Sequence, residues 1–78
     1  MKLQAVRNTP KILSEQAAEQ IADRIVAGSF AAGQQLPNEF DLAEQLGVGR
    51  GTVREAVKIL VSRNILEIRR GCGTFVCS

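Results

Sequence analysis

The segment from Gly47 to Lys58 constrains the fold more than any other part of this 78-residue chain. It opens with Gly-Val-Gly-Arg-Gly, a composition typical of a tight turn. Val53 and Val57 then recur at helical spacing and predict an apolar face. Arg50 and Arg54 stand four positions apart, so they are predicted to share another face of the same helix. Such a helix needs a hydrophobic partner on one side and leaves a cationic surface on the other.

A first helix is predicted over residues 14–27. Ser14 suits the N-cap position, and Gly28 suits the position just after the helix C-terminus. The acidic face of this helix would repel phosphates, so its expected role is packing. Its predicted buried stripe consists of apolar residues at helical spacing: Ala18, Ile21, Ala22, Ile25 and Val26.

Two more helices are predicted, a short one over residues 39–46 and a longer one over residues 50–63. Asn38 is the expected N-cap of the short helix, and Gly47 is expected to end it. Asn64 is the expected left-handed residue after the longer helix. Two helices joined by about three residues around a glycine describe a helix-turn-helix.

Three positions within this pair of helices fit the mechanics of that motif. Ala43 is small enough to let the helices approach, Gly47 can adopt the positive φ of the turn, and Val53 is expected to be buried between the helices. The alternative is a purely structural helical hairpin without a ligand.

A β-hairpin is predicted after the third helix, with strands at residues 65–68 and 74–77 around a loop at residues 69–73. An isolated loop of this kind would be a solvated turn. Directly after a helix-turn-helix, the better interpretation is a wing that reaches the minor groove of DNA. The predicted fold is therefore mainly α with a small β-hairpin (α+β), a winged helix-turn-helix with three helices followed by a two-stranded wing.

Charge is distributed unevenly along the chain. Residues 14–49 carry six anions against one cation, whereas residues 50–78 carry six cations against two anions. An acidic scaffold followed by a basic C-terminal half suits a polyanionic partner. From charge alone, a chance distribution of surface charges is an equally good explanation.

Several function classes lack support in the sequence. No apolar run is long enough to span a membrane, and the N-terminus lacks the apolar segment of a signal peptide, so a cytoplasmic protein is expected. If it binds DNA, it is expected to be nucleoid-associated. Cys72 and Cys77 are expected to be free thiols, with a hairpin disulfide as the alternative. Without histidine, neither a metal site nor a base to activate a cysteine is expected, and we predict no cofactor and no enzymatic activity. Cys72 beside arginines remains open to oxidation.

Five sequence blocks resemble the N-terminal winged-helix domain of GntR-type bacterial transcription regulators. They occur in the order and spacing of that family and cover roughly residues 14–76. The block Val53–Ala56, together with Leu66–Arg69 before the wing, leans toward the FadR-like branch. The blocks are Leu36–Glu39, Asp41–Ala43, Leu46–Arg50, Val53–Ala56 and Gly71–Val76.

The resemblance implies sequence-specific binding of double-stranded DNA, with helix 50–63 in the major groove and wing 69–73 at the minor groove. It implies a transcriptional regulator, with repression favoured over activation. Arg50 and Arg54 match positions that contact bases, in agreement with the two hydrogen bonds that arginine can donate to guanine. Lys58 is our own addition as a contact to the DNA backbone. The remaining positions implied by the resemblance are Gly51, Thr52, Arg70 and Gly71.

Three positions depart from the pattern of the family. Phe40 replaces an arginine that commonly touches DNA, so it is expected to pack against the domain or against a second copy. Gly49 replaces a serine or threonine, and Cys72 replaces a frequent basic residue. Phe40 also supports the alternative function, a winged-helix module that binds protein and not DNA.

The expected organisation is a flexible basic N-terminal arm over residues 1–13 and a winged helix-turn-helix domain over residues 14–78. The resemblance implies a homodimer, at least in the full-length protein, on an inverted-repeat operator. It also implies that a small-molecule effector would act only through a C-terminal domain that is absent from this chain.

Overall fold

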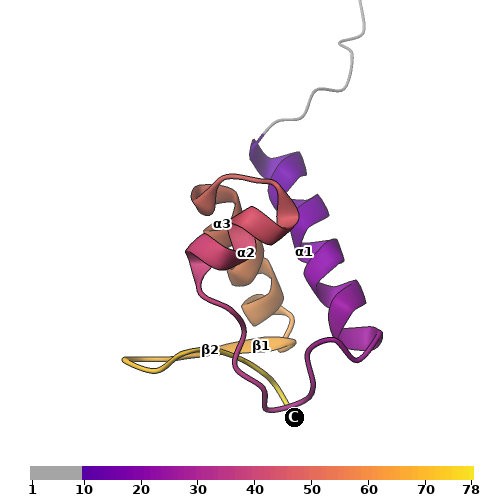
Figure 1. Ribbon diagram of the computed structural model, residues 1–78, viewed down its shortest axis with the longest axis vertical. Coiled ribbons are helices and arrows are strands. Elements are labelled where there is room, and N and C mark those ends of the chain that lie inside the picture. The colour runs from indigo at the N-terminus through magenta and orange to yellow at the C-terminus, as the bar shows by residue number, and fades with distance from the viewer. Residues whose placement is uncertain (1–9) are drawn as a thin grey trace, which may run out of the picture.

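A computed structural model describes residues 10–78 as three helices followed by a two-stranded antiparallel hairpin (Figure 1). This arrangement confirms the predicted winged helix-turn-helix fold. None of the helices described is long and apolar enough to cross a membrane. The elements in chain order are α1 (Pro10–Val26), α2 (Glu39–Leu46), α3 (Arg50–Ser62), β1 (Leu66–Arg69) and β2 (Gly73–Val76).

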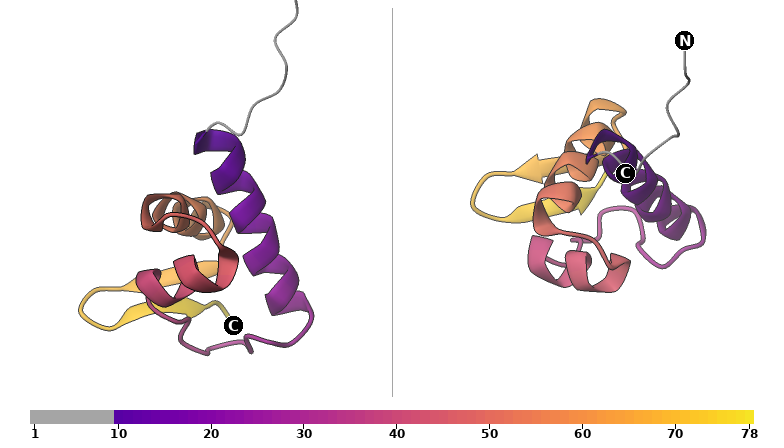
Figure 2. Two further views of the ribbon diagram at one scale, coloured as in Figure 1. Left: turned by 45° about the horizontal axis from the view of Figure 1, so that its top comes forward. Right: turned by 90° about the horizontal axis from the view of Figure 1, so that it is seen from above.

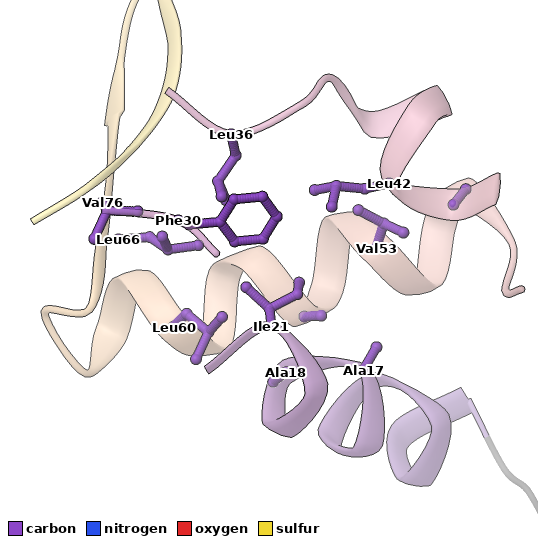
Figure 3. Close-up of a cluster of buried hydrophobic side chains, with 12 residues drawn as sticks. Ala17, Ala18, Ile21, Phe30, Leu36, Leu42, Val53, Leu60, Leu66 and Val76 are labelled. Atoms are coloured by element: carbon purple, nitrogen blue, oxygen red, sulfur yellow. The ribbon is translucent and has the colours of Figure 1, made fainter. Parts of the chain in front are cut away.

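Helix α3 lies at the centre of the domain, with α1 and α2 packed against different sides of it (Figures 2 and 3). Val53, Ala56 and Leu60 point from α3 into the core and are almost completely buried. The core described is aliphatic, as expected, except for Phe30 from the loop after α1. Its remaining members are Ala17, Ala18, Ile21, Leu36, Leu42, Ala43, Leu66 and Val76.

Helix α1 begins at Pro10, so the predictions of a helix start and an N-cap at Ser14 are wrong. Proline is favoured at the first position of a helix because its missing N–H would have no partner there. Ser14 is instead buried on the face of α1 that also carries the buried Ala17 and Ile21. Residues 10–13 of the predicted arm are therefore helical, and residues 1–9 lie outside the described part of the chain.

The predicted stripe of α1 is wrong at its C-terminal end, where Val26 is 88% exposed. Ile25 stands four positions after Ile21 and packs against the core, whereas Val26 is rotated a further step around the helix. The helix ends at Val26, and Gly28 follows with φ at +90°, as predicted for the residue after a helix C-terminus.

Helix α2 has the bounds and caps that its sequence predicts. The Asn38 side chain accepts a hydrogen bond of 2.8 Å from the backbone N–H of Asp41. Gly47 adopts the left-handed conformation, with φ at +70°, and its N–H donates to the Ala43 carbonyl. Asn64 likewise adopts a positive φ just after α3. Local chemistry at both ends therefore fixes the short helix that precedes α3.

Each strand of the hairpin lies one residue closer to the turn than predicted. Arg69 pairs with Gly73, so the turn spans only residues 70–72 and the predicted loop at residues 69–73 was too long. The Cys72 N–H closes the turn by donating to the Arg69 carbonyl at 2.9 Å. A three-residue turn with Gly71 at positive φ is a common way to close a hairpin, and it lets the strands pair further toward the tip.

The segment before α2 also contacts the hairpin. Gln35 forms an isolated bridge with Phe75, and its side-chain amide donates a 2.7 Å hydrogen bond to the Cys72 carbonyl. Gly73 makes this contact possible, because a Cβ at that position would lie 2.4 Å from the Gln35 amide nitrogen. The wing turn and β2 are thus tied to the chain that leads into α2.

Candidate nucleic-acid interface

Arg50, Arg54 and Lys58 lie at successive four-residue steps along α3, on the side opposite the core. Val53 and Leu60 hold the other side of the helix in the interior. The Arg50 and Arg54 side chains are 60% and 55% exposed, respectively. The sequence-predicted cations of α3 therefore form one exposed row, here called the cationic row.

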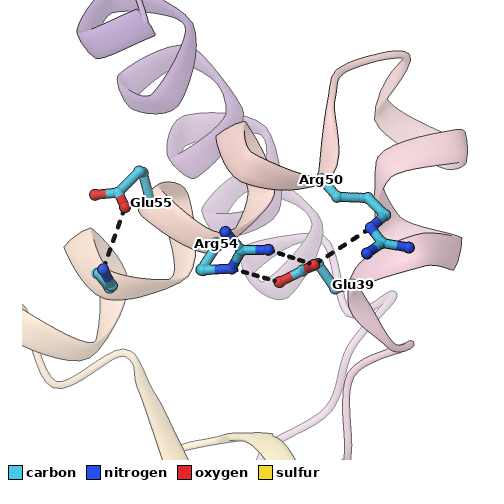
Figure 4. A network of polar contacts seen from close by, with 5 residues as sticks. Glu39, Arg50, Arg54 and Glu55 are labelled. Atoms are coloured by element: carbon cyan, nitrogen blue, oxygen red, sulfur yellow. Dashed lines mark hydrogen bonds and ion pairs between the residues drawn. The ribbon is translucent and has the colours of Figure 1, made fainter.

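A single carboxylate from α2 contacts both arginines of this row (Figure 4). Arg54 donates from Nε to Glu39 Oε2 at 3.1 Å and from Nη2 to Oε1 at 3.0 Å. Arg50 Nε lies 3.5 Å from the same Oε1. The hydrogen bond and the charge of Glu39 both raise the pKa of Arg54 and so favour the cationic form that arginine already has at physiological pH.

Lys58 forms an ion pair of 3.2 Å with Glu55, one turn back on the same helix. Both side chains are largely exposed, so this pair is expected to contribute little to stability. A cleft of about 410 Å³ separates this part of α3 from the hairpin, and its lining includes Arg54, Lys58, Ile68 and Cys72. The structure thus brings the end of the cationic row close to the base of the wing turn.

The two arginines of the wing differ in their surroundings. Arg69 belongs to β1, donates to Glu67 at 2.6 Å and lies 4.1 Å above the centre of the Phe75 ring. Both contacts hold Arg69 against the hairpin. Arg70 lies in the turn and forms no ion pair with any residue between 10 and 78. Together with the exposed Gly71, it is the wing cation available to a partner.

The remaining predicted positions are less informative. Gly51 is exposed and Thr52 half-buried in the first turn of α3. Phe40 is 54% exposed, so the prediction that it packs against the domain is not met. Packing against a second copy stays a prediction.

No group of three or more potential ligands that could hold a metal ion is found among residues 10–78. Cys72 and Cys77 are both free thiols, as predicted; Cys72 lies in the turn, whereas Cys77 follows β2. Cys77 Sγ lies 4.0 Å from a carboxylate oxygen of Glu67 and not against Cys72. The oxidation of the exposed Cys72 thiol stays a prediction.

Glu39 is the residue of this surface that the sequence analysis missed. Its position in the first turn of α2 suits the helix dipole, which favours an anion there, and needs no contact with α3. Its contact with Arg54, fifteen residues away, depends on the angle between α2 and α3. The only usable signal was the placement of Glu39 at the start of a helix that must pack against the helix carrying the two arginines.

Residues 13–76 match the family described as "Bacterial regulatory proteins, gntR family". The putative L-lactate dehydrogenase operon regulatory protein of Escherichia coli K12 is 45% identical over 67 residues, which are 86% of this chain and 26% of that protein. The HTH-type transcriptional regulator Mce2R of Mycobacterium tuberculosis is 43% identical over 76 residues, which are 97% of this chain and 31% of that protein. The chain therefore spans about a quarter to a third of the length of these relatives.

Solved structures have the same fold. A Streptococcus agalactiae GntR structure is 49% identical with a TM-score of 0.77, covering 83% of this chain and 31% of that one. AraR(DBD) in complex with operator ORR3 is 35% identical with a TM-score of 0.78, covering 99% of this chain and 90% of that one. In the second case nearly the whole of both chains superimposes, which makes it the more complete structural match of the two.

Proposed function

The chain belongs to the gntR family of bacterial regulatory proteins, and from this premise we propose that it binds double-stranded DNA in a sequence-specific manner as the DNA-binding part of a transcriptional regulator. The observation that carries the proposal is the exposed cationic row on α3, backed by a buried apolar face. The likeness to AraR(DBD), which was solved with an operator, supports it.

In the proposed complex α3 enters the major groove, where arginine can donate two hydrogen bonds to guanine O6 and N7. Arg50 and Arg54 are the proposed base-reading residues. Thr52 and Lys58 contact phosphates, and Gly51, which has no side chain, lets the start of α3 approach the backbone closely. The contribution of this surface is recognition and not catalysis.

The wing turn is proposed to reach the adjacent minor groove with Arg70 and Gly71. Arg70 is suited to this role because it is exposed and, among residues 10–78, unpaired. Two copies of the domain would read an inverted repeat, since a two-fold symmetric protein matches a two-fold symmetric site. A dimer, repression and an effector acting through a further domain are parts of the same proposal for the whole protein.

Selection from a pool of random DNA duplexes tests the proposed function directly. The 78-residue chain is expected to enrich one half-site, most strongly as an inverted repeat, and to keep its preference as salt is raised from 50 to about 200 mM while overall affinity falls. Random duplexes of equal length serve as the control. Binding no tighter to any selected duplex than to random DNA would refute sequence-specific recognition.

Lys58→Gln is expected to weaken binding by the same factor for every DNA sequence. A phosphate contact carries no base information, so its loss should lower the slope of log affinity against log salt by about 1. Binding at several salt concentrations to the selected and the random duplex measures this. Arg24→Gln, which removes a cation from α1, should leave the slope unchanged. A change in base preference for Lys58→Gln would place Lys58 at a base.

A further inference from the structure

Arg54 meets Glu39 with only one edge of its guanidinium group. The contact uses Nε and Nη2, which form the side of the planar fork. A guanidinium carries five N–H donors in fixed directions, so the end edge, formed by one N–H of each terminal nitrogen, stays unused. That end edge can donate two parallel hydrogen bonds to a guanine. One arginine can therefore hold Glu39 and read a base at the same time.

The carboxylate that holds Arg54 is itself well anchored. Glu39 is the first residue of α2, directly after the cap formed by Asn38. Buried Leu42 and Val53 pack in the same core and fix α2 against α3. The Glu39 side chain is only 34% exposed, so its charge is screened less than that of a fully solvated carboxylate. Glu39 thus has a defined position before any DNA arrives.

We propose that Glu39 is a positioning residue for base recognition, which orients the guanidinium of Arg54 and draws Arg50 toward the same carboxylate. This inference rests on the proposed function and adds a determinant of specificity to it. An arginine held in its binding geometry loses less side-chain freedom on binding, which favours the correct base pair. The same negative charge lies beside the surface that meets DNA and therefore weakens attraction to phosphates of any sequence. Glu39 thus lowers affinity for DNA of any sequence and raises discrimination between base pairs.

Two substitutions of Glu39 distinguish the effect of its charge from the effect of its side-chain length, and a third substitution serves as a control. Glu39→Gln removes the charge and replaces one acceptor with an amide that faces the arginine donors. Glu39→Asp keeps the charge but shortens the side chain by one methylene group. Glu55→Gln is the matched control, because it removes an exposed carboxylate of α3 that pairs with Lys58.

The readout is affinity for the selected duplex, for all its single-base-pair variants and for random DNA. Glu39→Gln is expected to reduce discrimination at the base pair read by Arg54 by about 3- to 10-fold and to tighten binding to random DNA. Glu39→Asp should lose the discrimination without the gain on random DNA. Glu55→Gln should show the gain without the loss. Adding Glu39→Gln to Arg54→Ala should change discrimination at that base pair no further.

Several results would overturn the inference while leaving the proposed function intact. Unchanged discrimination in Glu39→Gln is one. Another is a changed preference at a base pair that Arg54→Ala does not affect, since a carboxylate can itself accept a hydrogen bond from cytosine. An additive effect of the double substitution is a third. A wild-type chain that selects no duplex would instead refute the proposed function and, with it, the inference.

The orienting effect can also be measured without DNA. NMR relaxation of the Arg54 Nε–H group in the free chain should show a more restricted side chain in the wild type than in Glu39→Gln. The Nε–H of Arg24, which is not reached by Glu39, provides the internal reference. Equal mobility of Arg54 in the two proteins would contradict the proposal, provided that both remain folded by their amide spectra.

Discussion

Replacing Arg54 with alanine is expected to weaken binding to the selected duplex by about 1–3 kcal/mol, roughly 5- to 150-fold. The loss should be confined to the cognate base pair at one position of each half-site, so the variant becomes tolerant of all four bases there. The cause is the removal of a two-hydrogen-bond donor whose free edge is already oriented by Glu39. Titration of the duplex and its single-base-pair variants measures both quantities.

Arg63→Ala is the control for the loss of charge alone. Arg63 caps the far end of α3, away from Glu39, and carries the same charge as Arg54. Its removal is expected to lower affinity for selected and random DNA alike, without altering base preference. If Arg54→Ala behaved in the same uniform way, Arg54 would be a phosphate contact, and base recognition would have to come from elsewhere on α3.

Leu60→Ala is expected to lower the free energy of unfolding by about 2–5 kcal/mol. Leu60 is fully buried on α3, beside Ile21 of α1 (Figure 3). Truncation of Leu60 leaves a cavity that the surrounding core fills only partly, and this adds to the cost of the lost apolar contacts. Urea unfolding followed by circular dichroism at 222 nm gives the value. In a chain this small, most of the total stability would be lost.

Val26→Ala removes the same kind of apolar surface from a position that the structure leaves 88% exposed. Its effect on the free energy of unfolding should stay within about 0.5 kcal/mol. The pair of variants tests the rotation of α1 about its axis, since the sequence alone predicted Val26 to be buried. A cost for Val26→Ala comparable to that of Leu60→Ala would mean that α1 packs with a different face.

The contrast between α2 and α1 shows where sequence reasoning succeeded. The bounds of α2 follow from a cap at Asn38 and a left-handed glycine at Gly47, and both signals act within a few residues. Such local signals can be recognised in the sequence without knowledge of the rest of the fold. For this reason the bounds of α2 and the start of α3 were predicted correctly, whereas α3 ends at Ser62, one residue before its predicted end.

The start of α1 depended on information that a short window does not contain. Serine is a favoured N-cap residue, but Ser14 lies within α1 and is buried against the core. The helix continues back to Pro10, where a proline costs nothing. Tertiary packing therefore overrode the local preference of a single serine.

The candidate surface was predicted in part. The spacing of Arg50 and Arg54 placed them on one exposed face, as the structure has them. The link through Glu39 was not predictable, since it joins two helices whose crossing angle no periodicity specifies. The different surroundings of Arg69 and Arg70 also escaped prediction, because the strands pair one residue further toward the turn than expected and so include Arg69 in β1.

The hydrogen bond from Gln35 to the wing turn helps to fix the position of the turn relative to α2 and α3. Gln35 ties the turn to the segment that leads into α2, and α2 is packed against α3. On DNA, the separation between the bases read by α3 and the minor-groove position reached by the turn would then be set within each copy. The length of the half-site would then be the same in every regulator built on this domain. Operators would differ in the distance between half-sites, which depends on how two copies are joined.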